Sequence, residues 1–162
     1  MKIFFLSLML LILAFSPYSV KKLYGKKDIL SRKMLAVLIP ATISVIAHCL
    51  VILTRSEIVA RVAYAFYFSS ATWISIAVLD FCVCYGENKF SKKLLNWLVI
   101  PLGLVDTLCC FANISLPFLF SLRSVFYGSE EFLRYVPTHL FLIHVLFGYG
   151  LFGYCFVMLL NR

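Results

Sequence analysis

Residues 34–54 read MLAVLIPATISVIAHCLVILT, a run of 21 residues without a charged side chain. At a rise of about 1.5 Å per residue, a helix of this length crosses the roughly 30 Å hydrocarbon core of a bilayer. Pro40 lies near the start of the run and predicts a kink, which neighbouring helices can accommodate. We therefore predict a transmembrane helix over residues 34–54.

Similar apolar blocks recur along the whole chain. Hydrophobic residues make up 63% of the sequence and charged residues 14%, whereas a soluble domain is about half apolar and a quarter charged. We predict an all-α fold, a polytopic transmembrane bundle that forms one membrane domain over residues 1–162 and has the lipid bilayer as its first partner. The expected helices cover about residues 3–20, 34–54, 62–85, 94–114 and 138–160.

The charged residues predict the orientation of this bundle. The chain has 15 Lys and Arg against 7 Asp and Glu, for a net charge of +8. Residues 21–33 contain six basic residues and one acid, and residues 86–93 contain three lysines. Because basic loops stay in the cytoplasm, we predict an outer N-terminus and an inner C-terminus, and no nucleic acid as a partner.

Residues 115–137 are too charged to cross a membrane and too apolar for a plain solvated loop. They contain Arg123, Glu130, Glu131 and Arg134 among many aromatic residues. We expect this segment to lie as a lid over the outer mouth of the bundle. A short hairpin within FLFSLRSVFYG is one form that it could take.

The cysteines and glycines point to packing and not to a bound group. The six cysteines lie in apolar blocks, at positions 49, 82, 84, 109, 110 and 155. They form no CxxC pair, so we expect neither a disulfide framework nor a metal site. Residues 148–153 match GxGxxG, but inside a membrane helix this pattern predicts close helix packing on small residues, and we expect no cofactor.

Asp80 is an acid within an apolar block. An ionised carboxylate at the bilayer centre costs at least about 2.5–3.5 kcal/mol, so this side chain should face the bundle interior. Ser69, Trp73 and Asp80 are spaced by four and seven residues and therefore share one helix face. Asp80 either pairs with Lys92 or Lys93 near the inner surface or has a functional role, and both alternatives stay open.

Asp106 is the second such acid and lies nearer to mid-membrane. His48 and His144 fall in the outer halves of their helices, and either could hydrogen-bond Asp106 or the other histidine. We predict that His48, Asp106, Asn113 and His144 form a ligand site beneath the lid, with static hydrogen bonds between helices as the alternative. No motif indicates catalytic residues.

One stretch carries a resemblance to a known family. Residues 60–87, ARVAYAFYFSSATWISIAVLDFCVCYGE, are similar to the third helix of the N-terminal seven-helix membrane domain of bacterial histidine kinases and GGDEF diguanylate cyclases. Asp106, Asn113, Pro137 and His144 continue the similarity downstream. The resemblance implies a sensory domain in a bacterial inner membrane that responds to a small-molecule or periplasmic signal and can form a homodimer.

Proteins of that family place a cyclase or kinase domain after their seventh helix. The present sequence stops after five predicted helices, so we expect a truncated sensory part that lacks the catalytic output. A small transporter or an accessory subunit of a membrane complex is the alternative. That alternative rests on Asp80, Asp106, His48 and the prolines inside the predicted helices.

Overall fold

The computed structural model describes residues 2–26, 28–86, 89–127 and 130–160. The first three helices are α1 (Lys2–Tyr24), α2 (Ile29–Leu53) and α3 (Glu57–Gly86). The next span has three parts, α4 (Lys89–Leu94), the π-helical segment η1 (Leu95–Val99) and α5 (Ile100–Ala112). The last elements are β1 (Phe120–Tyr127), β2 (Glu130–Pro137) and α6 (Phe141–Leu160).

The predicted helices are present, with shifted boundaries. In the described part of the chain, five helices are long and apolar enough to cross a membrane. α2 begins five residues earlier than expected because the Asp28 carboxylate caps it, accepting the backbone N–H of Ser31 at 2.8 Å. α3 also begins early, and Glu57 in its first turn pairs with Arg61 one turn later at 2.6 Å.

The prediction of an all-α fold is wrong for residues 120–137. β1 and β2 form an antiparallel hairpin with Phe120 opposite Pro137. The strands alternate in exposure: Phe120 and Tyr135 turn toward the helices, whereas Arg123 and Arg134 are exposed. A period of two allows one apolar face to pack while the other meets water. The hairpin thus extends beyond the FLFSLRSVFYG segment.

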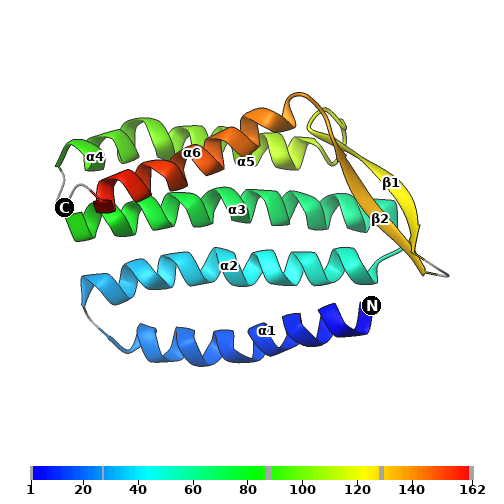
Figure 1. Ribbon diagram of the computed structural model, residues 1–162, viewed down its shortest axis with the longest axis horizontal. Coiled ribbons are helices and arrows are strands. Elements are labelled where there is room, and N and C mark those ends of the chain that lie inside the picture. Colours follow the sequence, from blue (N-terminus) through cyan, green and yellow to red (C-terminus); the bar gives the residue numbers. More distant parts are fainter. Residues whose placement is uncertain (1, 27, 87–88, 128–129, 161–162) are drawn as a thin grey trace.

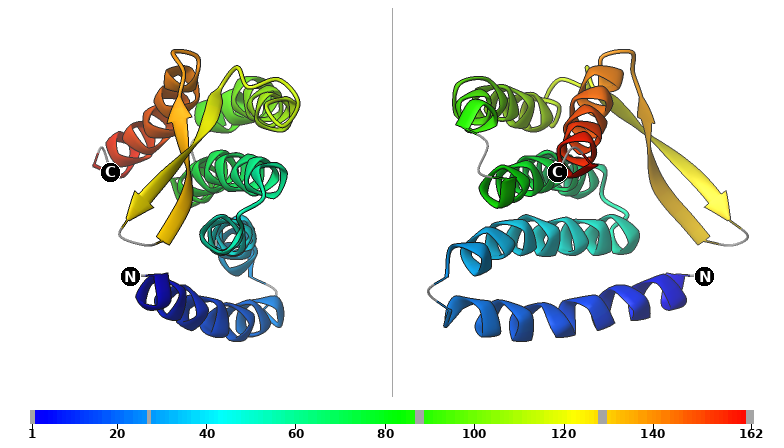
Figure 2. Two further views of the ribbon diagram at one scale, coloured as in Figure 1. Left: turned by 90° about the vertical axis from the view of Figure 1, so that its right-hand side faces the viewer. Right: turned by 60° about the vertical axis from the view of Figure 1, so that its left-hand side comes forward.

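α3 is the central helix. It packs against α2 on one side and against α5 and α6 on the other, while α1 packs against α2. Figure 1 shows α1, α2 and α3 side by side, and the end-on view in Figure 2 shows α5 and α6 diverging above α3. The hairpin crosses one end of this bundle.

Small side chains let α3 occupy this position. In the most apolar stretch of α3, 56% of the residues are buried, against at most 22% in the other four spans. Its buried residues include Ala60, Ala63, Ala65, Ser69 and Ser75. Small residues allow helix backbones to approach closely where lipid offers no hydrophobic drive for association. The sequence of α3 therefore suits contact with three neighbouring helices.

The glycines contribute less than the GxGxxG pattern predicts. A methyl group on Gly148 would meet the Ser75 hydroxyl oxygen at 3.7 Å, but one on Gly150 or Gly153 would meet nothing within 4 Å. Close packing at the last two positions is therefore not found. Gly103 on α5 is the tight position, since a methyl group there would overlap the Ile76 side chain of α3.

The fourth span is distorted just before Pro101, and the distortion takes the form of η1. Pro101 has no N–H to donate to the carbonyl one turn earlier, and the Ile100 N–H bonds the Leu95 carbonyl, five residues back. Such π-helical turns commonly accompany breaks in the helical hydrogen-bond ladder. The fourth span therefore consists of two α-helical parts joined by a wider turn.

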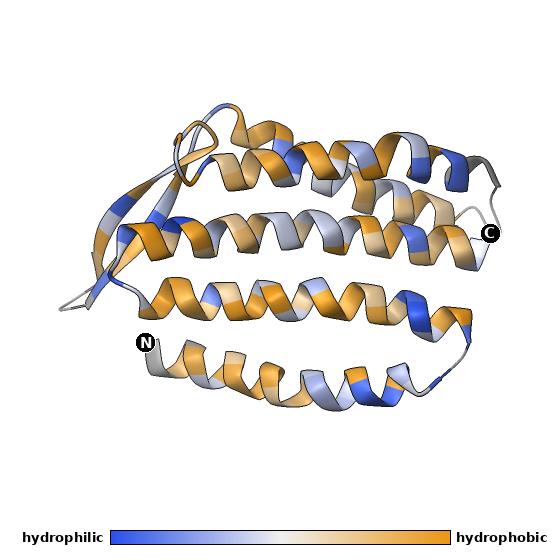
Figure 3. Cartoon of the chain, turned by 180° about the vertical axis from the view of Figure 1, so that it is seen from behind, coloured by the Kyte–Doolittle hydropathy of each residue, from blue (hydrophilic) through white to orange (hydrophobic). Residues whose placement is uncertain are grey.

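The two ends of the bundle differ in character. Hydrophilic residues gather at the helix ends, while apolar residues predominate along the middle (Figure 3). The start of α1, the α2–α3 link and the hairpin lie at one end (Figure 1). Lys21, Lys33 and Lys92 lie toward the other end. Lys27, Glu87 and Asn88 of the two predicted inner loops and Asn161 and Arg162 at the C-terminus fall outside the described residues.

Candidate functional site between α3, α5 and α6

A buried carboxylate joins three helices. The Thr72 hydroxyl of α3 donates to Oδ2 of Asp106 on α5 at 2.5 Å. Nδ1 of His144 on α6 lies 3.0 Å from both carboxylate oxygens. The side chains of His144 and Asp106 are only 8% and 13% exposed. With the carboxylate ionised, which allows it only to accept, Nδ1 carries the hydrogen in this contact.

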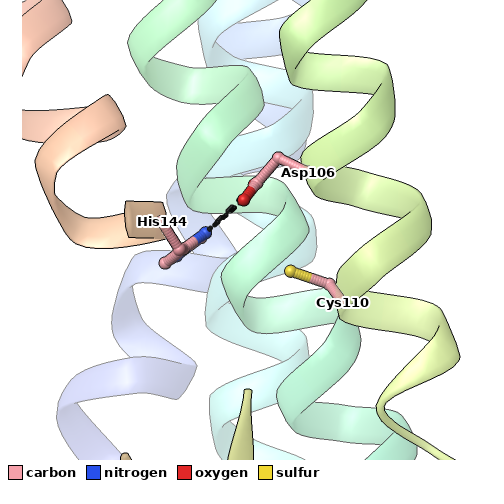
Figure 4. A group of neighbouring side chains, drawn as sticks. All are labelled: Asp106, Cys110 and His144. Carbon is pink, nitrogen blue, oxygen red and sulfur yellow. Dashed lines mark hydrogen bonds and ion pairs between the residues drawn. The ribbon is translucent and has the colours of Figure 1, made fainter. Parts of the chain in front are cut away.

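Cys110 completes a cluster with Asp106 and His144. Figure 4 shows its sulfur directed toward the space between the other two side chains. A carboxylate oxygen, the sulfur and an imidazole nitrogen all lie within 4.8 Å of one another, and Cys110 is fully buried. Asp106 and Cys110 are four residues apart on α5 and so lie on one face. That spacing was visible in the sequence, but the prediction treated Cys110 only as a packing residue.

His48 does not reach this cluster, so its predicted hydrogen bond with Asp106 or His144 is wrong. It lies on α2, and α3 stands between α2 and the helices that carry Asp106 and His144. Its ring packs on Tyr67 with centroids 5.1 Å apart. Among the described residues, its Nδ1 has no hydrogen-bond partner.

Asn113 is fully buried and is used to hold the loop before the hairpin. Its side-chain oxygen accepts the N–H groups of Leu119 at 2.7 Å and Phe120 at 3.2 Å, and its amide donates to the Phe120 carbonyl at 3.0 Å. These bonds explain why α5 ends at Ala112 and the chain turns into β1. The contact of Asn113 with a ligand remains a prediction, and its polar atoms already have backbone partners.

Aromatic rings connect the hairpin to the cluster. The Phe68 ring lies 5.2 Å from that of Phe120 in β1, 5.1 Å from that of Tyr135 in β2 and 5.5 Å from the His144 imidazole. The Tyr64 hydroxyl donates to the Leu133 carbonyl at 3.1 Å. The hairpin is thus seated on α3 directly beside His144. Aromatic pairs of this kind are worth about 0.5–1.5 kcal/mol each beyond area burial.

A groove of about 470 Å³ reaches the cluster from the side of α3 and α6. Its lining includes Thr72, His144, Gly148 and Phe141, together with Tyr135 of the hairpin. The lining is mostly apolar, with few polar groups, which is typical of small-molecule sites. The groove gives a bound molecule or ion a path to Thr72 and His144.

A second groove, of about 700 Å³, lies between α2, α3 and the fourth span. Ser69, Trp73 and Asp80 all line it, which confirms that they share one face. Asp80 pairs with Lys33 of α2 at 2.5 Å, so the predicted pairing with Lys92 or Lys93 is wrong. The physical reason is that α2 lies directly beside α3 with its basic first turns next to Asp80, whereas Lys92 and Lys93 are exposed.

Trp73 is tied to the fourth span. Its indole N–H donates to the Thr107 hydroxyl at 3.0 Å, and Thr107 in turn donates to the Gly103 carbonyl at 2.8 Å. Thr107 neighbours Asp106, so the faces of α5 that bear them both contact α3. Trp73 and Thr72 therefore fix the rotation of α5 from two sides.

Comparison with protein-family models, with curated proteins and with solved structures gives no match to this chain.

Proposed function

We propose that the chain is a membrane-embedded sensory domain in which the hairpin covers a switch formed by Thr72, Asp106 and His144. The observation that carries this proposal is the carboxylate–imidazole pair between α5 and α6, buried in an apolar bundle beside the hairpin. Ionisable groups inside a membrane protein are costly, and they commonly mark functional positions. Because the pair joins α5 to α6 beside the hairpin, a movement of the hairpin would act on both helices.

The proposed orientation has the hairpin outside the cell and the basic end inside. The basic residues of 21–33 and 89–93 support it, because loops rich in Lys and Arg stay in the cytoplasm. A cysteine introduced at Lys26 and one introduced at Ser121 provide the test. The Ser121 variant should react with an impermeant thiol reagent in intact cells, and the Lys26 variant should react only after lysis. The unmodified chain is the control, since its own cysteines lie in the helices.

The signal in this proposal is a shift between two packings of the helices. A ligand shifts such an equilibrium only by its difference in affinity for the two states. α6 leads directly from the hairpin to the opposite end of the bundle (Figure 1). A displacement of His144 relative to Asp106 would therefore move the inner end of α6.

The resemblance of residues 60–87 to the sensory domains of bacterial histidine kinases and diguanylate cyclases supports the same role. We accordingly place the chain in a bacterial inner membrane, with a small molecule or periplasmic factor as the signal. A cyclase or kinase domain on the cytoplasmic side would receive it.

Hydrogen–deuterium exchange of the chain in lipid nanodiscs tests the switch. Asp106→Asn removes the charge that holds His144, so exchange should increase both in the hairpin and in the last turns of α6. Asp80→Asn is the matched control, because it removes the other intramembrane carboxylate of an ion pair away from the hairpin. Its effect should be confined to α2 and α3 near Lys33.

Unchanged exchange in the hairpin and in α6 of a folded Asp106→Asn protein would refute the switch. The transporter alternative has its own signature, which is substrate flux in reconstituted vesicles coupled to protons and abolished by Asp106→Asn. Observation of that flux would replace the sensory proposal. A sensory domain should show no such flux in the native chain or in the variant.

A further inference from the structure

We propose that Asp106, Cys110 and His144 bind a divalent transition-metal ion, with zinc as the best fit. Their donor atoms already lie within 4.8 Å of one another in a buried position. Tetrahedral zinc with bonds of about 2.0–2.3 Å places its donors roughly 3.5 Å apart. Small rotations of the three side chains would bring the donors to that spacing.

The donor set fits the ion chemically. Imidazole nitrogen, thiolate sulfur and carboxylate oxygen are all ordinary zinc ligands, and a mixed set of this kind favours zinc over magnesium or calcium. Three protein ligands leave a fourth position for water or a small ligand. The sequence has no CxxC pair, and the ligand set consists instead of a carboxylate and a thiol four residues apart on α5 with an imidazole from α6.

Charge balance favours this ion inside an apolar bundle. A carboxylate and a thiolate carry two negative charges, which neutralise one divalent cation, and the imidazole ligand is neutral. A buried charge is strongly unfavourable unless it is compensated, and this ligand set leaves none. Binding through Nδ1 releases the Cys110 thiol proton and moves the imidazole hydrogen from Nδ1 to Nε2, so the protons are accounted for.

The surrounding residues hold the ligands as metal sites require. The Thr72 hydroxyl donates to Oδ2 of Asp106 and fixes the carboxylate. The His144 ring contacts the rings of both Phe68 and Phe141, at centroid distances of 5.5 and 5.3 Å. A hydrogen bond to a metal ligand, like that from Thr72, orients the ligand and raises metal affinity by about 10- to 100-fold. The groove lined by Thr72 and His144 gives the ion its entry path.

Cobalt and zinc titrations of the full chain in chelator-treated nanodiscs test the site. We expect one cobalt ion per chain, with the absorption of a tetrahedral centre that has a single thiolate ligand, and displacement by zinc. Cys110→Ser should remove the thiolate band, and Asp106→Asn should weaken binding more than about 100-fold, because even outer-shell losses reach that range. Thr72→Val should weaken it about 10-fold.

Two cysteine controls are available. Cys109→Ser alters the neighbouring thiol and should leave the cobalt spectrum unchanged. Cys82→Ser breaks the separate Cys82–Cys155 thiol pair of α3 and α6 and should also leave the cobalt spectrum unchanged. If either control removes the band, or if Cys110→Ser retains it, the assignment is wrong.

A measurement on the native chain avoids any dependence on variants that fail to fold. X-ray absorption of the zinc-loaded protein should show one sulfur near 2.3 Å, with the remaining ligands nitrogen or oxygen near 2.0–2.2 Å. Two sulfur ligands, or none, would overturn the proposal. Failure of the native chain to bind either metal would do the same.

The use of the ion as a signal rests on the proposed sensory function, but its binding does not. If zinc binds and leaves exchange in the hairpin and α6 unchanged, the metal site stands and the ion is not the signal. If zinc does not bind while Asp106→Asn still alters that exchange, the switch stands and the metal site fails. The spectroscopic and exchange measurements therefore separate the two proposals.

Discussion

Gly103 allows α5 to approach α3 closely enough for the polar cluster to form. A methyl group at this position would overlap Cδ1 of Ile76 and lie 3.7 Å from Cγ2 of Thr72. Gly103 is one turn before Asp106, and Thr72 is the residue that donates to that carboxylate. Gly103→Ala should therefore push the helices apart at the point where Asp106 meets α3.

Two opposing effects determine how much Gly103→Ala changes the free energy of unfolding. Alanine is favoured over glycine in a helix by about 1 kcal/mol. Extra volume in a packed interior costs about 1–3 kcal/mol, and Ile76 is only 4% exposed, so its end has little room to turn away. The net change for Gly103→Ala should be a loss of roughly 0–2 kcal/mol in the free energy of unfolding. Gly103→Val should lose more.

Gly150→Ala is the matched control, because a methyl group there would meet nothing within 4 Å. It should be neutral or more stable by up to about 1 kcal/mol. Because the helix-propensity gain of alanine is common to both variants, their difference isolates the packing cost of about 1–3 kcal/mol. Reversible unfolding of both variants in mixed micelles measures it. If Gly103→Ala matches Gly150→Ala within about 0.5 kcal/mol, the close approach of α3 and α5 is not a constraint.

Three further variants test single contacts. Asn113→Leu should lower the free energy of unfolding by about 2 kcal/mol or more, because the N–H groups of Leu119 and Phe120 lose their acceptor. Asn113→Asp keeps an acceptor oxygen and should lower the free energy of unfolding by less. His48→Phe preserves ring packing on Tyr67 and removes Nδ1, which has no hydrogen-bond partner in the part of the chain that the structure describes, so stability should be unchanged or up to about 1 kcal/mol higher. Hydrogen bonds from Ser31, first from its hydroxyl and then from its backbone N–H, lower the pKa of Asp28. Relative to Asp28→Asn, the native chain should therefore be more stable at neutral pH. This extra stability should be lost as the pH falls through the lowered pKa.

Each of these has a clear contrary result. Equal stability of Asn113→Leu and Asn113→Asp would show that the loop amides find another acceptor. A loss of more than about 1 kcal/mol for His48→Phe would reveal a hydrogen-bond partner of the imidazole. A stability difference at Asp28 that does not change between neutral and acidic pH would exclude the charged cap as its source.

The sequence predicts the helices of this protein, but it predicts the hairpin only in part. A long apolar run such as residues 34–54 predicts a helix of membrane-spanning length, and such a helix is present as α2. The cost of a carboxylate in lipid predicts that Asp80 and Asp106 face other helices. The alternation in residues 120–127 and 130–137 carries the strand signal. That signal was masked because the segment is short and highly aromatic, and the register appears only when both strands pair.

The sequence does not predict which side chains pair with the buried polar groups. Asp106 had two candidate histidines at comparable depth, and only the position of α3 between α2 and α6 excludes His48 and selects His144. Asp80 likewise pairs with Lys33 because α2 lies beside α3. Transfer free energies act on each side chain along the chain, so they determine which segments are apolar helices and which polar groups must be buried. The neighbours of a helix depend on how all the helices pack together, and no local pattern in the sequence contains that information.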